Sequence, residues 1–463
     1  EKLIRFLDVL TKRSNKLEVI NIQQCKTIEY LFDLPLALIP DEDGHGIYFT
    51  QMRELKLIEL YNLEFVWRGN PVGIFGLENL QLIHIKRCPS LRLLFYYDVT
   101  EKLHQLNELK LEACESLKDL IYSSSEKRPT TKFPSLTKVE LKSLSRLEWF
   151  YIYRVEFPSL KSLTIEKCPK MTSFTNGFAT KDESSTIIDG KSFFELNELT
   201  LRSCDKLILV LSLDKLKVLY VMNQPVEELW HYNYPSESFC ELENLTLRNN
   251  KKLLSVFSPA MIVRFNKLKK LTLEKCELLA EVFILEGDKP NHDNQEMLPQ
   301  LRVLAMSNLS KLTCFWNKEP QVPFFLNLVS LFIIHCHCLK SLFSLSQAQN
   351  LKKLKILRLC NCEKVEEVIS SDKGEKVATI FPKMKCLVLK DLPKLVNFCQ
   401  EGGCFNWPNL QTVRVNNIPS MKTFLRDDLN TPLLKSVYIT FAKKLWLGNL
   451  NKTISYVHNN PGV

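Results

Sequence analysis

Aliphatic residues recur along the chain at positions one, four and six of a repeated pattern. The segment that begins Leu106, Leu109 and Leu111 is one example, and the segments from Leu160 and Leu268 repeat its spacing. The pattern reads L-x-x-L-x-L-x-x-C-x-x-L. Its sixteen copies begin at Leu17, Met52, Leu80, Leu106, Leu136, Leu160, Leu196, Leu216, Leu242, Leu268, Leu301, Leu328, Leu354, Met384, Leu410 and Leu434. All sixteen hold Leu, Ile, Val or Met at the three positions, which chance does not produce when about half of average residues are apolar.

The copies start about 28 residues apart on average, which is the period of leucine-rich repeats. Positions four and six point to one side of a short strand, and stacked parallel strands bury them in a continuous core. The sequence therefore predicts an α/β-type solenoid: a curved leucine-rich-repeat horseshoe of about sixteen repeats. Its concave side would be a parallel sheet, and its convex side irregular or short helical. Residues 17–445 would form the solenoid, 1–16 an N-terminal cap or the end of a preceding domain, and 446–463 a C-terminal cap and tail.

Position nine, where the chain turns away from the strand, is cysteine in half of the copies. These eight residues are Cys25, Cys88, Cys114, Cys168, Cys204, Cys276, Cys336 and Cys362. A free cysteine behaves as a small, usually buried hydrophobe with a weak donor. We expect these thiols to be buried and reduced. Their sulfurs should not pair with one another, because each lies at the same height in its own coil, and a reducing, cytoplasmic compartment fits them.

Phenylalanine and tryptophan bracket the aliphatic pattern. One ring lies three residues before many repeat starts, as at Phe133, Phe157 and Phe193, and another lies near the repeat end, as at Phe150 and Phe283. We interpret these rings as core residues stacked beneath the convex side.

The residue pattern resembles the leucine-rich-repeat region of plant intracellular immune receptors, best of all the coiled-coil, nucleotide-binding subclass of disease resistance proteins. The resemblance rests on C-x-x-L repeats alternating with L-x-x-L repeats, and on Leu-Glu-Trp-Phe at 147–150. It also rests on Phe-Pro before the repeat start, as at Phe133-Pro134, Phe157-Pro158 and Phe381-Pro382. It implies recognition of a pathogen effector or an effector-modified host guard protein, and restraint of the receptor's own nucleotide-binding domain.

The chain contains no G-x-x-x-x-G-K-[ST] motif, so a bound nucleotide would belong to an upstream domain, and we expect no cofactor in this chain. The alternative function is the substrate-recognition solenoid of an F-box-type ubiquitin ligase, whose repeats also use cysteine at position nine. Those repeats are nearer a uniform 26 residues, whereas repeat lengths vary here. An extracellular receptor would show L-x-G-x-I-P, which is absent.

The sequence offers little evidence for catalysis or metal binding. No nucleophile elbow, H-E-x-x-H or kinase signature occurs, and solenoids usually bind through extended surfaces, so we expect no enzyme. His335-Cys336-His337-Cys338, with Cys360 and Cys362 one repeat later, offers zinc-type ligands. Because Cys336 and Cys362 occupy position nine, we favour a structural role for them and expect no metal.

The charge balance is mildly basic, with a net charge of +10 and a pI of about 8.8. Position seven reads Lys86, Glu112, Lys142, Glu166 and Arg202 in consecutive repeats. Opposite charges on adjacent strands predict cross-strand pairs rather than a groove of one sign, so we expect no nucleic-acid partner. No run of about 18 apolar residues occurs, and we expect no membrane insertion.

Positions three, five and seven point outward from the predicted sheet, and we call them the outward positions. In the repeats from Leu106 to Leu196 all twelve are polar or charged, whereas eight of twelve are apolar in the repeats that start at 301, 328, 354 and 384. A contiguous exposed apolar surface usually marks an interface. We define the apolar patch, our candidate protein-binding site, as Val303, Ala305, Phe332, Ile334, Ile356, Arg358, Cys360, Cys386, Val388 and Lys390. Arg358 and Lys390 could steer an acidic partner. In the alternative that stays open, the insertion Leu285–Met297 folds over the patch.

Overall fold

The structure is a computed structural model of the 463-residue chain. It describes residues 16–33, 47–48, 51–68, 74–75, 77–123, 130–173, 193–207, 213–230, 238–285, 296–320, 322–370, 379–400, 405–426, 429–440 and 442–460. These residues form two compact units. Unit 1 comprises Glu1–Tyr220 and Asn233–Phe239, and unit 2 comprises Val221–Tyr232 and Cys240–Val463.

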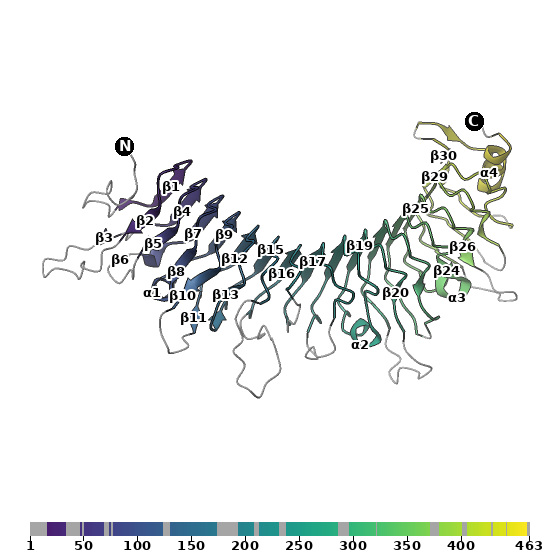
Figure 1. Cartoon of the computed structure of the whole chain (residues 1–463). Helices are drawn as coiled ribbons and strands as arrows, with labels where there is room; N and C mark the ends of the chain where they lie inside the picture. The colour runs from purple at the N-terminus through teal and green to yellow at the C-terminus, as the bar shows by residue number, and fades with distance from the viewer. Residues whose placement is uncertain are drawn as a thin grey trace. The chain divides into compact units, whose positions relative to one another are not determined.

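In unit 1 the predicted repeats form a parallel sheet with one strand from each repeat (Figure 1). These strands are β1 (Val19–Gln23), β4 (Glu54–Ile58), β7 (Leu82–Lys86), β9 (Glu108–Glu112), β12 (Lys138–Lys142), β15 (Ser162–Glu166) and β16 (Glu198–Arg202). Equivalent positions pair in register, as Leu109 does with Ile83 and Val139. Positions four and six are buried in these strands, except that Ile22 at position six of β1 is half-buried, which confirms the predicted leucine-rich-repeat solenoid.

Unit 2 repeats this arrangement. Its parallel strands are β18 (Asn244–Arg248), β19 (Lys270–Glu274), β21 (Val303–Ser307), β23 (Ser330–Ile334), β25 (Ile356–Cys360), β27 (Cys386–Lys390), β29 (Thr412–Asn416) and β30 (Val437–Tyr438). The boundary between the units falls within β17 (Val218–Met222). All sixteen predicted repeat starts are thus followed by a strand.

A left-handed residue at position eight ends these strands. Its φ lies between 52° and 59° in fifteen copies, at Gln24, Glu59, Arg87, Ala113, Ser143, Lys167, Ser203, Asn223, Asn249, Lys275, Asn308, His335, Asn361, Asp391 and Asn417. None is glycine, although this conformation disfavours most other residues. In thirteen of these copies the backbone N–H of the position-eight residue donates to the position-seven carbonyl of the next repeat, as from Arg87 to Glu112 at 2.8 Å. This bond continues the sheet ladder through the turn and offsets the conformational cost.

Position nine then directs its side chain into the core. The thiol of Cys168 lies 3.4 Å from the Glu166 carbonyl in its own repeat and 3.7 Å from the Leu141 carbonyl in the preceding one. Seven of the eight position-nine cysteines are buried, as predicted. Cys25 is only half-buried, because β1 pairs with β4 alone among the described strands.

Short parallel strands also follow the turns, which the sequence analysis did not predict. In unit 1 they are β2 (Tyr30–Asp33), β5 (Phe65–Arg68), β8 (Leu93–Tyr96), β10 (Asp119–Tyr122) and β13 (Trp149–Tyr151), with the pairs β3 (Ile47–Tyr48) and β6 (Ile74–Phe75), and β11 (Thr131–Lys132) and β14 (Val155–Glu156). In unit 2 they are β20 (Glu281–Phe283), β22 (Cys314–Trp316), β24 (Phe343–Ser344), β26 (Glu367–Ser370) and β28 (Asn397–Cys399). One-turn helices accompany them, namely α1 (Tyr97–Thr100), α2 (Pro259–Ile262) and α3 (Leu345–Ala348).

The predicted aromatic rings fill the space between the main strands and these short elements. Phe157 stacks on Phe133 and Phe193, with centroids 5.8 and 5.5 Å apart, and meets Phe150 edge-on at 5.1 Å. In unit 2, Phe283 stacks on Phe257. Their burial confirms that the rings belong to the core.

Unit 2 ends in a hairpin and a helix. Strand β31 (Lys444–Leu445) pairs antiparallel with β30, and α4 (Leu450–Asn459) follows. The Asn449 side chain accepts the Lys452 N–H at 2.8 Å and begins the helix. Helix α4 lies in the segment predicted as a C-terminal cap. Of the predicted N-terminal segment 1–16, only residue 16 lies within the described residues.

Candidate functional site

The ten residues of the apolar patch lie on four adjacent strands of unit 2, in register. Ala305, Phe332, Arg358 and Val388 form one row across β21, β23, β25 and β27. Val303, Ile356 and Cys386 belong to a second row, and Ile334, Cys360 and Lys390 to a third. The structure therefore brings all ten together on one face of the sheet.

Exposure across the patch is uneven, which corrects the expectation that all outward positions are accessible. Phe332, Ile334 and Ile356 are half-buried, whereas Val388 is 7% exposed and Cys360 is 8% exposed. Val388 pairs in register with Arg358 on one side and Arg414 on the other. The aliphatic stems of such long side chains cover a small residue between them, while their charged ends reach water.

Arg358 lies in the middle of the patch and contacts the Phe332 ring. Its Cζ lies 5.8 Å from the centroid of the Phe332 ring, a distance at which cation and ring attract. Burial raises the pKa of the Cys360 thiol, and the Arg358 and Lys390 charges act in the opposite direction. The patch is therefore a half-buried apolar surface with exposed cations rather than a bare apolar one.

Sequence reasoning missed how this row continues beyond Val388. Arg414 on β29 and Tyr438 on β30 occupy position five of the next two repeats, and Lys444 on β31 pairs in register with Tyr438. The Arg414 Cζ lies 4.7 Å, and the Lys444 Nζ 4.6 Å, from the Tyr438 ring centroid. We call Phe332, Arg358, Val388, Arg414, Tyr438 and Lys444 the basic–aromatic row. Reading position five through the last two repeats would have found Arg414 and Tyr438, but Lys444 is brought in only by the antiparallel hairpin.

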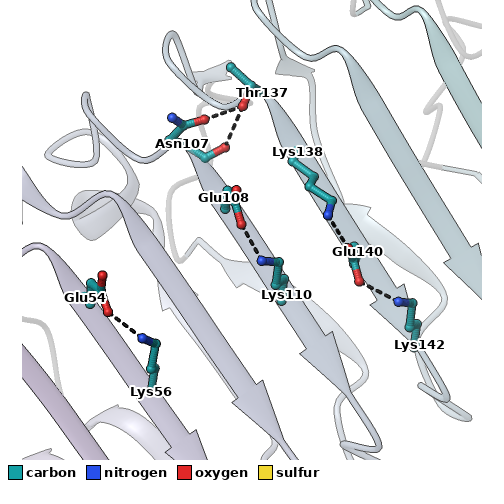
Figure 2. A network of polar contacts seen from close by, with 9 residues as sticks. All are labelled: Glu54, Lys56, Asn107, Glu108, Lys110, Thr137, Lys138, Glu140 and Lys142. Carbon is teal, nitrogen blue, oxygen red and sulfur yellow. Dashed lines mark hydrogen bonds and ion pairs between the residues drawn. The ribbon is translucent and has the colours of Figure 1, made fainter.

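The corresponding face of unit 1 is a network of ion pairs (Figure 2). Lys56 pairs with Glu54, and Lys110 with Glu108, within single strands. Glu140 lies between Lys138 and Lys142 of its own strand. Although partial burial alone would raise the pKa of Glu140, the hydrogen bonds from the two lysines lower it to about 2.

The predicted cross-strand pairs at position seven are confirmed only in part. Lys86 pairs with Glu112 at 3.0 Å, and Arg202 with Glu166 at 3.2 Å. Lys142 instead bonds Glu140 two residues earlier, because a lysine side chain reaches the next outward position of its own strand. In the described part of unit 1, carboxylates thus neutralise much of the basic charge.

Burial keeps the cysteines of the repeats in the less reactive thiol form. Burial raises the pKa of the Cys114 and Cys168 thiols to about 12, and that of Cys276 to about 11. No disulfide joins the cysteines that the structure describes. Within the same residues, no group of three or more His, Cys, Asp or Glu side chains is arranged to hold a metal ion.

These thiols allow a direct test. Because the reactive species is the thiolate, we expect maleimide at neutral pH to leave Cys88, Cys114, Cys168, Cys204, Cys276, Cys336 and Cys362 unmodified in the native protein. Half-exposed Cys338 should react, and all should react after denaturation in urea. Peptide mass spectrometry would assign each site. Native labelling of the seven, or a disulfide between any two, would contradict their burial as free thiols.

No helix among the described residues is both long and apolar enough to cross a membrane. The insertion Leu285–Met297 falls mostly outside those residues, so the alternative in which it folds over the patch is not tested by the structure.

Two plant proteins resemble part of this chain in sequence. The disease resistance protein UNI of Arabidopsis thaliana is 31% identical over 139 residues, which are 28% of this chain and 15% of that protein. The Arabidopsis disease resistance protein RPS5 is 30% identical over 134 residues, or 28% of this chain and 14% of that protein. The matched segments thus span about one seventh of each relative.

Among solved structures, the mouse RP105/MD-1 complex matches 89% of this chain and 74% of its own, with 16% identity and a TM-score of 0.36. A leucine-rich-repeat protein of Leptospira interrogans matches 83% and 86%, with 15% identity and a TM-score of 0.32. The sequence profile described as plant disease resistance protein RPS2-like, leucine-rich repeats, matches residues 3–115 and 215–363. These two segments make up more than half of the chain, which therefore belongs to the RPS2-like leucine-rich-repeat family of plant disease resistance proteins.

Proposed function

We propose that this chain is the recognition and autoinhibition arm of a plant disease resistance receptor in the cytoplasm. It binds a pathogen effector, or a host guard protein that an effector has modified, through the apolar patch on β21, β23, β25 and β27. Without that ligand, it restrains the receptor's nucleotide-binding domain. The whole receptor's partners are part of the proposal, because the relatives match only over a small part of their length.

The observation that carries the proposal is the contrast between two faces built on the same repeat. In strands β9, β12, β15 and β16 of unit 1, all twelve outward positions carry polar or charged side chains, several in ion pairs. In unit 2 the equivalent positions carry Val303, Phe332, Ile334 and Ile356, all half-buried. The repeat does not require apolar residues there, since within each strand only positions four and six face the core. Half-exposed apolar side chains beside exposed cations are typical of a protein interface.

The test replaces Phe332 and Ile356 with glutamate in the full-length coding sequence, expressed in leaf tissue with and without the pathogen. Both side chains reach solvent, so the double variant should fold. We expect either loss of the cell-death response to the pathogen, or cell death without it if the patch contacts the nucleotide-binding domain. Val388→Glu is avoided, because that side chain is buried and its replacement would destabilise the sheet.

A matched control places the same charges in unit 1. Ser162→Glu with Thr200→Glu introduces two carboxylates at outward positions of neighbouring strands, β15 and β16, and should leave the response unchanged. Protein blots confirm equal accumulation of both variants. If the Phe332 and Ile356 variant accumulates normally and responds like wild type in both assays, the patch is not the recognition site.

A further inference from the structure

We infer that the basic–aromatic row binds an acidic segment of a partner protein, one that presents two carboxylates on either side of aliphatic side chains. The inference rests on the proposed function, because it assigns the partner's chemistry at the same surface. It also extends that surface beyond β27, across β29, β30 and β31, where the apolar patch does not reach.

Charge sets this part of the sheet apart from the rest. The outward positions of the last six repeats, from β21 to β30, include Arg358, Lys390 and Arg414 but no Asp or Glu. The outward positions of six strands in unit 1, from β4 to β16, carry six glutamates and six lysines or arginines. The outward positions thus balance their charges in unit 1 and carry only cations at the C-terminal end of unit 2, where Lys390 also lies 3.5 Å from the carboxylate of Asp391 at position eight. A cationic face favours an acidic partner.

The cations of the row are held by ring faces rather than by carboxylates. Arg358 lies over Phe332, and Arg414 and Lys444 lie over Tyr438. Among the residues that the structure describes, no carboxylate pairs with these three cations. All three are exposed. A guanidinium held against a ring keeps its donors directed outward, so it binds a carboxylate at a lower cost in side-chain entropy.

Spacing limits which ligands fit. Neighbouring strands lie about 4.8 Å apart, so the backbones of Arg358 and Arg414, two strands apart, are separated by about 10 Å. Arg358 leans over Phe332 on β23 and Arg414 over Tyr438 on β30, so their guanidinium groups diverge and lie farther apart than the backbones. Buried Val388 lies between them, and Ile356 and Cys386 lie beside it at position three. The surface therefore complements two carboxylates more than about 10 Å apart with aliphatic groups between them. A nucleic acid would need cations along its whole length and has no aliphatic groups to place on this strip.

The experiment measures peptide binding to the 463-residue chain by fluorescence anisotropy. The probe is a labelled glutamate–leucine peptide of repeated Glu-Ser-Leu-Ser, in which glutamate and leucine share one face because alternate residues of an extended chain point to the same side. It is compared with a lysine–leucine peptide of equal length, in which lysine replaces glutamate, and with single-stranded oligouridylate. We expect the glutamate–leucine peptide to bind about tenfold or more tightly than either other probe. Its affinity should fall several-fold between about 50 and 200 mM NaCl, because the exposed charges are screened.

Matched variants locate the site. Arg358→Gln with Arg414→Gln should weaken binding of the glutamate–leucine peptide about tenfold, with an unchanged circular dichroism spectrum. Lys56→Gln with Lys110→Gln removes two position-five cations from unit 1 that already pair with glutamates, and should leave binding unchanged. Equal losses in both variants, no binding of the glutamate–leucine peptide, or tighter binding of either other probe would each overturn the inference.

The same variants separate this inference from the proposed function. The arginine double variant, Arg358→Gln with Arg414→Gln, can respond normally in leaf tissue while the double glutamate variant of the patch does not. That result supports the apolar patch as the recognition site and refutes an acidic partner at the basic–aromatic row. If the arginine variant also loses the response and the peptide, both are supported.

Discussion

Replacing Phe157 with alanine should lower the free energy of unfolding of unit 1 by about 3–5 kcal/mol, the range for truncating a fully buried aromatic side chain. Phe157 is 0% exposed and packs on the rings of Phe133, Phe150 and Phe193 from three repeats. Since each repeat buries its apolar face only against its neighbours, a cavity here weakens coils on both sides. The urea midpoint, followed by far-ultraviolet circular dichroism, measures the loss.

Phe194→Ala is the matched control, because Phe194 belongs to the same segment but is 49% exposed. It should move the midpoint little, since surface substitutions usually change stability by less than about 0.5 kcal/mol. If the urea midpoint of Phe157→Ala lies as close to the wild-type midpoint as that of Phe194→Ala does, the stacked rings contribute little to the stability of the core.

The main strands could be predicted from the sequence because their signal is redundant. Each of sixteen repeats carries the same three aliphatic positions, and each repeat confirms the register of the others. The burial of the position-nine cysteines and of rings such as Phe157 follows from the same repetition. The left-handed residue at position eight could not be found this way. Its occupants, from Arg87 to Asn361, share no side-chain type, and the conformation is imposed by the ladder bond to the next repeat.

The candidate site could be predicted only in outline. Position in the repeat places Phe332 and Ile334 correctly on the solvent face. It does not show that Val388 is buried, because that burial depends on the length of its neighbours, Arg358 and Arg414, on two other strands. Lys444 joins the row through a hairpin outside the repeat pattern. Periodicity thus determines which face a residue occupies, whereas its exposure depends on neighbours from other repeats.

Asn250 provides the second large expected effect, because it replaces the usual cysteine at position nine with a side chain that forms two buried hydrogen bonds. Its Nδ2 donates to the Val221 carbonyl at 3.0 Å, and its Oδ1 accepts the Gln224 N–H at 2.8 Å. Asn250 itself is 0% exposed. Alanine would remove both of these hydrogen bonds from the core. We expect Asn250→Ala to lower the free energy of unfolding of unit 2 by about 2–4 kcal/mol.

Asn250→Cys distinguishes lost hydrogen bonds from lost volume. Cysteine occupies the same position in the next repeat, where the Cys276 thiol lies 3.6 Å from the Glu274 carbonyl and 4.0 Å from the Leu247 carbonyl. A thiol is a weak donor, so cysteine at residue 250 should restore part of the bonding to Val221 and little of the acceptor for Gln224. The urea midpoint of the cysteine variant should therefore lie between those of wild type and Asn250→Ala. If it coincides with that of Asn250→Ala, the thiol contributes no hydrogen bonding at position nine, and the seven buried cysteines at this position serve only as small hydrophobes.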